Sequence, residues 1–168
     1  MRKLANFSEL FANGFAGLNR FVDIMRTEPT IQDKPDAKVL ARAGAKVALL
    51  DIAEIDTTQF DPTGERAFAY VCNVGDYENV KAVFEKIYED FGRIDILVNN
   101  AGMGISGAVE FTDTEDAQKI FDVNFFGMVN VNKAVIPYMR ESSGGRIVNI
   151  SSVAAVAHIP FQTYYSAS

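Results

Sequence analysis

Short apolar runs alternate with helical patterns along most of the chain, from residue 37 to residue 168. Runs rich in β-branched or apolar residues predict four strands, namely Lys46–Leu50, Ala67–Cys72, Ile94–Val98 and Arg146–Ile150. Helical patterns fill the longer gaps between them, and strands that alternate with helices build parallel sheets through crossover connections. The pattern therefore predicts an α/β fold with a parallel sheet.

Two of the intervening segments predict crossover helices. Between the second and third strands, apolar residues recur at helical spacing at Val80, Val83, Phe84, Ile87 and Phe91. Asp76 precedes this segment and is a favourable N-cap residue, so we expect a helix that begins there and covers one face of the sheet. Between the third and fourth strands, Thr114–Arg140 has a long helical pattern without proline before Pro137.

The first 36 residues follow a different pattern. Apolar residues recur every three or four positions from Leu4 to Met25, which predicts an amphipathic helix. Thr27–Lys38 is polar, contains two prolines and predicts a connector. We therefore divide the chain into an N-terminal segment, residues 1–36, and an α/β domain, residues 37–168. A helix packed on the domain is the simplest interpretation of the segment, and a partner-binding or targeting role is the alternative.

Composition narrows the classes of partner. The formal net charge of -6 and the pI near 4.8 argue against nucleic acid, because phosphate binding needs clustered Lys and Arg. Cys72 is the single cysteine, so the sequence indicates neither an internal disulfide nor a cysteine-based metal site. No apolar run approaches the roughly 18 residues that span a bilayer. We expect a cytoplasmic protein that acts on small molecules, with no membrane, nucleic acid or metal partner.

Polar residues follow the first two predicted strands. Ligands of doubly wound folds lie at the carboxyl ends of the strands, and Asp51 ends the first of them. An Asp there can accept hydrogen bonds from an adenosine ribose diol and repels a 2′-phosphate, which favours NAD over NADP; the alternative is a solvated turn carboxylate. The second strand runs into Asn73 and Val74, where the amide could bond an adenine edge.

The third strand carries the most informative motif. It runs directly into Asn99-Asn100-Ala101-Gly102, in which small residues let a ligand approach the backbone and the amides can tie strand ends together. This motif resembles the Asn-Asn-Ala-Gly signature of the short-chain dehydrogenase/reductase family. The resemblance extends over about Ala37–Ser168 and implies a Rossmann-like doubly wound parallel sheet with crossover helices.

Further motifs match that family in order and spacing. Asn124 resembles the asparagine that distorts its helix and holds a water in the proton path. Ser152 lies 13 residues before Tyr165 (165 − 152), the usual catalytic separation, and Tyr165-Ser-Ala-Ser168 resembles the start of Tyr-x-x-x-Lys. The resemblance implies catalytic roles for Tyr165, Ser152 and Asn124, with Tyr165 and Ser152 also contacting substrate. It implies a cofactor site that includes Asn100, Ala101, Gly102 and Tyr165.

The implied reaction is hydride transfer between nicotinamide C4 and an alcohol or carbonyl carbon, with Tyr165 transferring the hydroxyl proton. Ser152 would bond the substrate oxygen, and Asn124 would complete a water relay. A tyrosine hydroxyl ordinarily ionises far above neutral pH, so the family places a lysine one helical turn later to favour the phenolate. The resemblance also implies dimers or tetramers of identical chains.

The sequence departs from the family at two places. The lysine position would immediately follow Ser168, and family members continue into a C-terminal portion that shapes the substrate pocket. The glycine-rich motif that opens the family is not found; gap-free extension places its glycines on Thr27, Ile31 and Asp33. We therefore expect an incomplete fold, without the first strand and its glycine loop, and weak or no activity of these 168 residues. The alternative is a non-catalytic Rossmann-like binding or interaction module.

Overall fold

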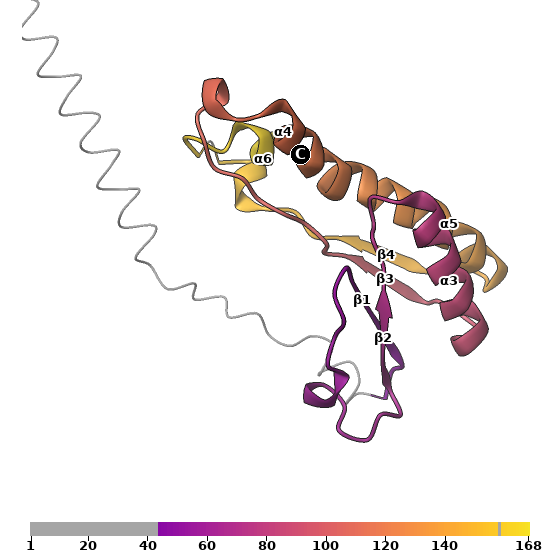
Figure 1. Cartoon of the computed structure of the whole chain (residues 1–168). Helices are drawn as coiled ribbons and strands as arrows, with labels where there is room; N and C mark the ends of the chain where they lie inside the picture. The colour runs from indigo at the N-terminus through magenta and orange to yellow at the C-terminus, as the bar shows by residue number, and fades with distance from the viewer. Residues whose placement is uncertain (1–43, 158) are drawn as a thin grey trace, which may run out of the picture. The chain divides into compact units, whose positions relative to one another are not determined.

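Residues 44–157 and 159–168 are described by a computed structural model (Figure 1). They contain four strands, β1 (Val47–Asp51), β2 (Ala67–Val71), β3 (Ile96–Asn99) and β4 (Arg146–Asn149). The amphipathic helix expected over Leu4–Met25, the connector after it and the division at residue 36 lie outside the described residues.

The strands form two parallel pairs, which confirms the predicted parallel arrangement. In the first pair Val47 lies opposite Ala67, and in the second Ile96 lies opposite Arg146. The predicted and observed bounds of each strand agree to within two residues. β1 extends to Asp51 because the Asp51 carbonyl accepts a 2.8 Å hydrogen bond from the N–H of the residue after β2. β3 begins later than predicted because its first bond to β4 is the one from Arg146 N–H to the carbonyl just before Ile96.

The two pairs form separate sheets within the described part of the chain. β1 bonds only β2 there, and β3 bonds only β4, so no described strand joins β1 to β3. In a doubly wound sheet of this family the first strand lies between these two strands. The observed order therefore agrees with the expectation of an incomplete sheet.

Helix α3 (Tyr77–Phe91) crosses from β2 to β3 and begins as the sequence predicts. The Asp76 carboxylate accepts hydrogen bonds from the N–H groups of Glu78 (3.0 Å) and Asn79 (3.2 Å), which satisfies two free donors of the first turn. The helix ends at Gly92, whose φ of 75° is a left-handed conformation that glycine adopts without strain. Its buried residues are Val80, Phe84 and Ile87.

A second crossover leads from β3 to β4 and is a nearly continuous rod in Figure 1. It comprises α4 (Thr114–Phe121), a π-helical turn η3 (Asp122–Gly127) and α5 (Met128–Glu141). The single helix predicted over Thr114–Arg140 is therefore interrupted by a wider turn, of the kind that is frequent at functional sites. Pro137 lies inside α5, and the helix continues for four residues after it.

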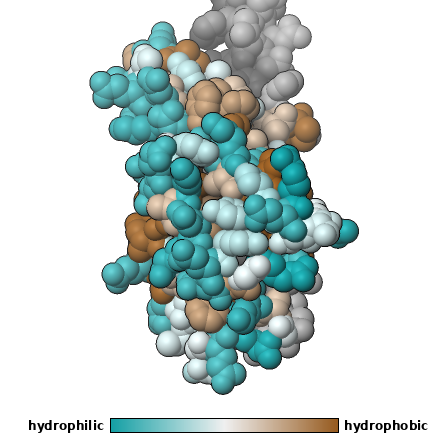
Figure 2. Space-filling view, turned by 90° about the vertical axis from the view of Figure 1, so that its right-hand side faces the viewer, coloured by the Kyte–Doolittle hydropathy of each residue, from teal (hydrophilic) through white to brown (hydrophobic). Residues whose placement is uncertain are grey.

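The hydrophobic core lies between one face of the strands and helices α3 and α5, which pack on each other. Leu97 of β3 and Ile147 of β4 point into it, whereas their neighbours Ile96, Val98 and Val148 face away and are exposed. The surface in Figure 2 is mostly hydrophilic with separate apolar patches. Within residues 44–157 and 159–168, no helix is both long enough and apolar enough to cross a bilayer.

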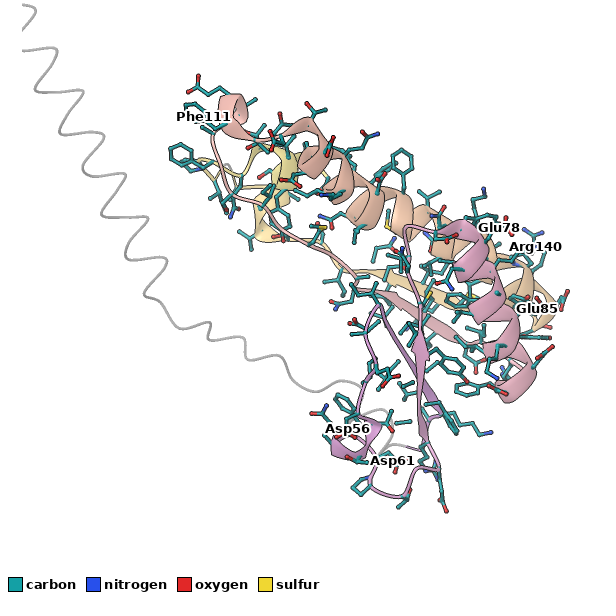
Figure 3. All side chains as sticks on the ribbon, viewed as in Figure 1. Asp56, Asp61, Glu78, Glu85, Phe111 and Arg140 are labelled. Atoms are coloured by element: carbon teal, nitrogen blue, oxygen red, sulfur yellow. The ribbon has the colours of Figure 1, made fainter. Side chains whose placement is uncertain are left out.

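Short turns complete the described fold. Helical turns η1 (Thr57–Gln59), η2 (Val109–Phe111) and η4 (Val153–Ala155) lie in the connections, and α6 (Thr163–Ala167) follows η4. The connection from η1 to β2 is organised by Asp61, labelled in Figure 3. Its carboxylate accepts bonds from the Thr63 hydroxyl (2.6 Å) and from the N–H groups of Thr63, Arg66 and Ala67. The Thr63 hydroxyl bond, followed by the bond from Arg66, lowers the pKa of Asp61 to about 2.

Candidate active site

Polar residues follow each strand at its carboxyl end. Asp51 ends β1, Asn73 follows β2, Asn100 follows β3 and Ser152 follows β4. Because the strands of each pair are parallel, their carboxyl ends lie at one edge of that pair. This is the edge at which α/β proteins of the doubly wound type bind ligands.

Asp51 presents an open carboxylate at the end of β1. Its Oδ1 accepts a hydrogen bond from Ala53 N–H at 3.0 Å, and the side chain is exposed. The described residues supply no ion pair to it. Oδ2 therefore remains available to an external donor such as a hydroxyl pair.

The loop after β2 is closed by its own hydrogen bonds. Asn73 Oδ1 accepts from Gly75 N–H at 3.1 Å, and the Asn73 N–H donates to Asn79 Oδ1 at 2.7 Å. The side-chain nitrogen Nδ2 of Asn73 has no hydrogen-bond partner within the described residues, so it is free to donate to an acceptor. Burial raises the pKa of the neighbouring Cys72 thiol, which makes this cysteine a packing residue rather than a nucleophile.

An asparagine cluster ties the ends of β3 and β4 together. Asn99 Nδ2 donates to Asn149 Oδ1 at 2.8 Å and to Asn132 Oδ1 of α5 at 2.9 Å. This is the tie that the Asn-Asn motif suggests. The following residues, Asn100 to Gly102, are exposed and have no helical or strand structure. An added Cβ at Gly102 would make an ordinary contact with Asn124 Oδ1 at 3.5 Å, so the protein itself does not exclude a methyl there.

Asn124 lies in the π-helical turn η3 and joins two segments far apart in sequence. Its Oδ1 accepts from Met103 N–H at 2.8 Å, and its Nδ2 donates to the Met103 carbonyl at 3.0 Å. Nδ2 also donates to Ser168 Oγ at 2.8 Å, and the Ser168 hydroxyl donates to the Tyr165 carbonyl at 3.0 Å. Asn124 thus holds the segment after β3 against α6. The π-helical turn is the helix distortion that the family resemblance implies at this residue.

Ser152 is the N-cap of η4. Its Oγ accepts a hydrogen bond from Ala154 N–H at 3.2 Å, which fixes the oxygen. Its hydroxyl hydrogen has no acceptor among the described residues and is free to donate. Helix α6, which carries Tyr165, packs on η4, so the serine and the tyrosine come from adjoining elements.

Tyr165 lies beside the glycine-containing segment that follows the Asn-Asn-Ala-Gly motif. An added Cβ at Gly104 would lie 3.7 Å from Tyr165 Cδ2, so the ring contacts this backbone. Gly107 N–H donates to the Phe161 carbonyl at 2.7 Å, and Gln162 Nε2 donates to Ser106 Oγ at 3.3 Å. The segment from Gly104 to Gly107 is therefore bonded to the start of α6. The Tyr165 hydroxyl makes no hydrogen bond to the part of the chain that the structure describes.

Sequence reasoning did not identify two asparagines of α5. Asn132 is bonded to Asn99, and Asn130 Nδ2 donates to the Val74 carbonyl at 3.0 Å. Asparagine is a poor helix former, so two of them within three residues of a helix are a local anomaly. That anomaly is the signal that indicates tertiary contacts here, although it does not identify the partners.

Comparison with known proteins points to one family. A family model described as short-chain dehydrogenase matches residues 35–168. A 3-ketodihydrosphingosine reductase from Bacteroides thetaiotaomicron is 48% identical over 98 residues, which cover 58% of this chain. The chain spans 36% of the length of that reductase.

Two solved structures give the same result. An NAD+-bound xylitol dehydrogenase superposes with a TM-score of 0.72 at 33% identity, covering 78% of this chain and 52% of its own. ElxO with NADP bound superposes with a TM-score of 0.70 at 28% identity, covering 79% of this chain and 56% of its own. The chain therefore spans about half the length of these structures and has their Rossmann-type fold in part. With the family model matched over most of its length, the chain belongs to the short-chain dehydrogenase/reductase family of NAD(P)-binding oxidoreductases.

Proposed function

We propose that this protein is an NAD-dependent oxidoreductase that transfers hydride between nicotinamide and the carbon of an alcohol or carbonyl substrate. The proposal rests on how Tyr165 and Ser152 are arranged beside the backbone that follows β3. The exposed backbone of Asn100–Gly102 leads into the segment that contacts Tyr165, and α6 packs on η4, which Ser152 caps. A proton donor and a hydrogen-bond donor for one substrate oxygen thus come from adjoining elements beside an open backbone.

The described residues fit a dinucleotide. Asp51 would bond the adenosine ribose diol through its free Oδ2, and Asn73 with Val74 would contact the adenine. The backbone of Asn100–Gly102 would lie against the cofactor, because these residues are exposed at the carboxyl end of β3 and have no helical or strand structure. When bound, the nicotinamide supplies the hydride donor or acceptor.

Tyr165 and Ser152 would handle the substrate oxygen. In reduction, Tyr165 gives its hydroxyl proton to that oxygen while the carbon gains hydride, and in oxidation the phenolate takes the proton back. Ser152 donates a hydrogen bond to the same oxygen with its free hydroxyl hydrogen. Both amide hydrogens of Asn124 are engaged, so a relay water would bond the second lone pair of its Oδ1.

The preference for NAD rests on Asp51. Its exposed carboxylate has no cationic partner among the described residues, so its charge would repel a 2′-phosphate. The solved relatives include both an NADP-bound and an NAD+-bound protein, so the family alone does not choose between the cofactors.

For the 168 residues themselves we propose weak turnover. Gap-free extension of the sequence would place the family's three phosphate-loop glycines on Thr27, Ile31 and Asp33, and an Asp at the third position would set a negative charge against the pyrophosphate. The same observation favours a second candidate, a non-catalytic Rossmann-like binding module. Homo-oligomers and a cytoplasmic location belong to the proposal as well, from family resemblance and composition.

A paired assay separates the two candidates. The 168-residue chain is titrated with NAD and NADP by calorimetry, and turnover of a panel of alcohols and ketones is followed by nicotinamide absorbance. For an oxidoreductase, Tyr165→Phe lowers the weak turnover further, whereas the matched variant Tyr164→Phe leaves it unchanged. Turnover that Tyr165→Phe does not alter would exclude the proposed mechanism. No binding of either dinucleotide at millimolar concentration would favour the module.

A further inference from the structure

The loop after β2 rests on the helix that follows the π turn. Asn130 of α5 donates from Nδ2 to the Val74 carbonyl at 3.0 Å, across 56 positions of sequence. Gly127, at the end of η3, is buried, and an added Cβ there would lie only 2.7 Å from Val74 Cγ2 and 3.2 Å from Val74 Cβ. Val74 therefore has two contacts with this helix: its carbonyl accepts the bond from Asn130, and its side chain packs against the backbone of Gly127.

The Val74 carbonyl depends on Asn130 because the rest of the loop is closed internally. The Asn73 N–H donates to Asn79 Oδ1, and the Asn73 carbonyl accepts a hydrogen bond from Asp76 N–H. The Asn73 side-chain oxygen Oδ1 accepts from Gly75 N–H. Among the described residues, Asn130 alone bonds the Val74 carbonyl. Without that bond the oxygen of the peptide between Val74 and Gly75 keeps no partner among the described residues, and the peptide is held only by the bond from Gly75 N–H to Asn73 Oδ1.

The same helical rod also holds the other half of the site. Asn124 of η3 bonds Met103 and Ser168, and Asn132 of α5 bonds Asn99 at the end of β3. Asn130 is the member of this series that reaches the loop carrying Asn73 and Val74. One rigid element thus sets the loop after β2 relative to the segment after β3.

We propose that Asn130 is a positioning residue for the adenosine end of the dinucleotide, acting through Val74. This inference rests on the proposed function, because it assigns Asn73 and Val74 to the adenine. Asn130 touches no reacting atom; it fixes the Val74 peptide, which in turn sets the direction of the free Asn73 amide nitrogen and of the Val74 side chain.

Asn130→Leu tests this, since leucine has a similar size and no donor. Asn132→Leu is the matched control, with the same change two residues further on the same helix but with its lost bond directed to β3. Each full chain is titrated with ADP-ribose by calorimetry, and amide hydrogen exchange is measured without ligand. We expect Asn130→Leu to weaken ADP-ribose binding about tenfold, because binding must then order a peptide that the partly buried hydrogen bond held in place, and to speed exchange at residues 74–76. Asn132→Leu should leave exchange at residues 74–76 unchanged and should weaken ADP-ribose binding less than Asn130→Leu does.

The outcomes separate this inference from the proposed function. If the unaltered chain fails to bind ADP-ribose at millimolar concentration, the proposed function fails, and the role of Asn130 toward a nucleotide fails with it. If the unaltered chain binds and Asn130→Leu binds equally well with unchanged exchange at residues 74–76, only the inference is overturned. Equal losses of affinity in both variants would also overturn it, because they would indicate a general loosening of α5.

Discussion

The two halves of the candidate site differ in how their polar side chains are used. In the half at β3 and β4, asparagine amides bond each other and the backbone, as Asn99 does with Asn149 and Asn124 with Met103. In the half at β1 and β2, the outward atoms of Asp51 and Asn73 keep free positions. The asparagines of the first half are used for internal order, although its Ser152 hydroxyl hydrogen and its Tyr165 hydroxyl have no partner among the described residues. In the second half Asp51 and Asn73 present atoms outward.

This difference predicts which property each substitution changes. A side chain bonded to other protein groups leaves them unpaired when it is removed, so its loss lowers the free energy of unfolding. A replacement that keeps the atom bonded to the protein and alters only the atom that faces solvent, as Asp51→Asn does, changes ligand affinity alone. We therefore expect stability effects in the half at β3 and β4 and affinity effects at Asp51 and Asn73.

The largest effect is expected at Asn124. Asn124→Ala removes three hydrogen bonds, to both backbone groups of Met103 and to Ser168, and should lower the free energy of unfolding by about 1–3 kcal/mol. Urea denaturation followed by circular dichroism measures the change. A variant as stable as the unaltered chain would contradict the view that this half is ordered by its own bonds.

An effect on affinity is expected within the same half at Gly102. Gly102→Ala adds a methyl that meets no protein atom closer than 3.5 Å, so thermal stability should stay unchanged. Dinucleotide affinity should fall by roughly 1–2 kcal/mol, or about tenfold, because the methyl occupies space that the cofactor backbone contact requires. Gly107→Ala is the control; its methyl would lie 2.9 Å from Thr112 Oγ1, so it should lose stability. Unchanged affinity in Gly102→Ala would remove this backbone from the proposed cofactor site.

Whether the sequence could predict a given contact depends on how far apart its two residues lie along the chain. The strands, the Asp76 cap and the buried face of α3 follow from local periodicity, and their predicted positions agree with the structure to within two residues. The bonds of Asn130 to Val74 and of Asn132 to Asn99 span 56 and 33 positions. A pattern of residue types shows that these amides are unusual in a helix but cannot select their partners, because the selection is made by tertiary packing.

The structure around the motif residues could be predicted from the sequence only in part. Family resemblance implies a distorted helix at Asn124, and the π-helical turn is there. It does not indicate that both amide hydrogens of Asn124 are engaged by Met103 and Ser168. The roles of Asp51, Ser152 and Tyr165 toward ligands stay predictions, because they concern free atoms whose partners are not protein groups.

A smaller effect is expected at Asp51. Asp51→Asn keeps an acceptor for Ala53 N–H and removes the charge, so stability should be unchanged. The affinity for NAD should fall by about 1 kcal/mol, or roughly fivefold, because a neutral acceptor bonds the ribose diol more weakly, and the ratio of NADP to NAD affinity should rise. Calorimetry with both dinucleotides measures the ratio, and Glu54→Gln is the control with the same change in net charge. An equal ratio in the two variants would mean that Asp51 does not select the cofactor.

The last and sharpest test of the comparison concerns Asp61 in acid. It is the exception in the half at β1 and β2, because its carboxylate is bonded by Thr63, Arg66 and Ala67. Those bonds lower its pKa to about 2, below the usual value near 3.9 of an unfolded chain. The ionised form is thus favoured by folding, so its contribution to stability is complete above about pH 4 and is lost as pH falls toward 2.

Hydrogen exchange at pH 5, 3.5 and 2.5 should show β1 and β2 loosening in acid before β3 and β4. Asp61→Asn should reduce that pH dependence, since asparagine does not ionise. Simultaneous loosening of both pairs in the unaltered chain would show that the two halves are one cooperative unit, and the contrast between them would then be confined to ligand contacts.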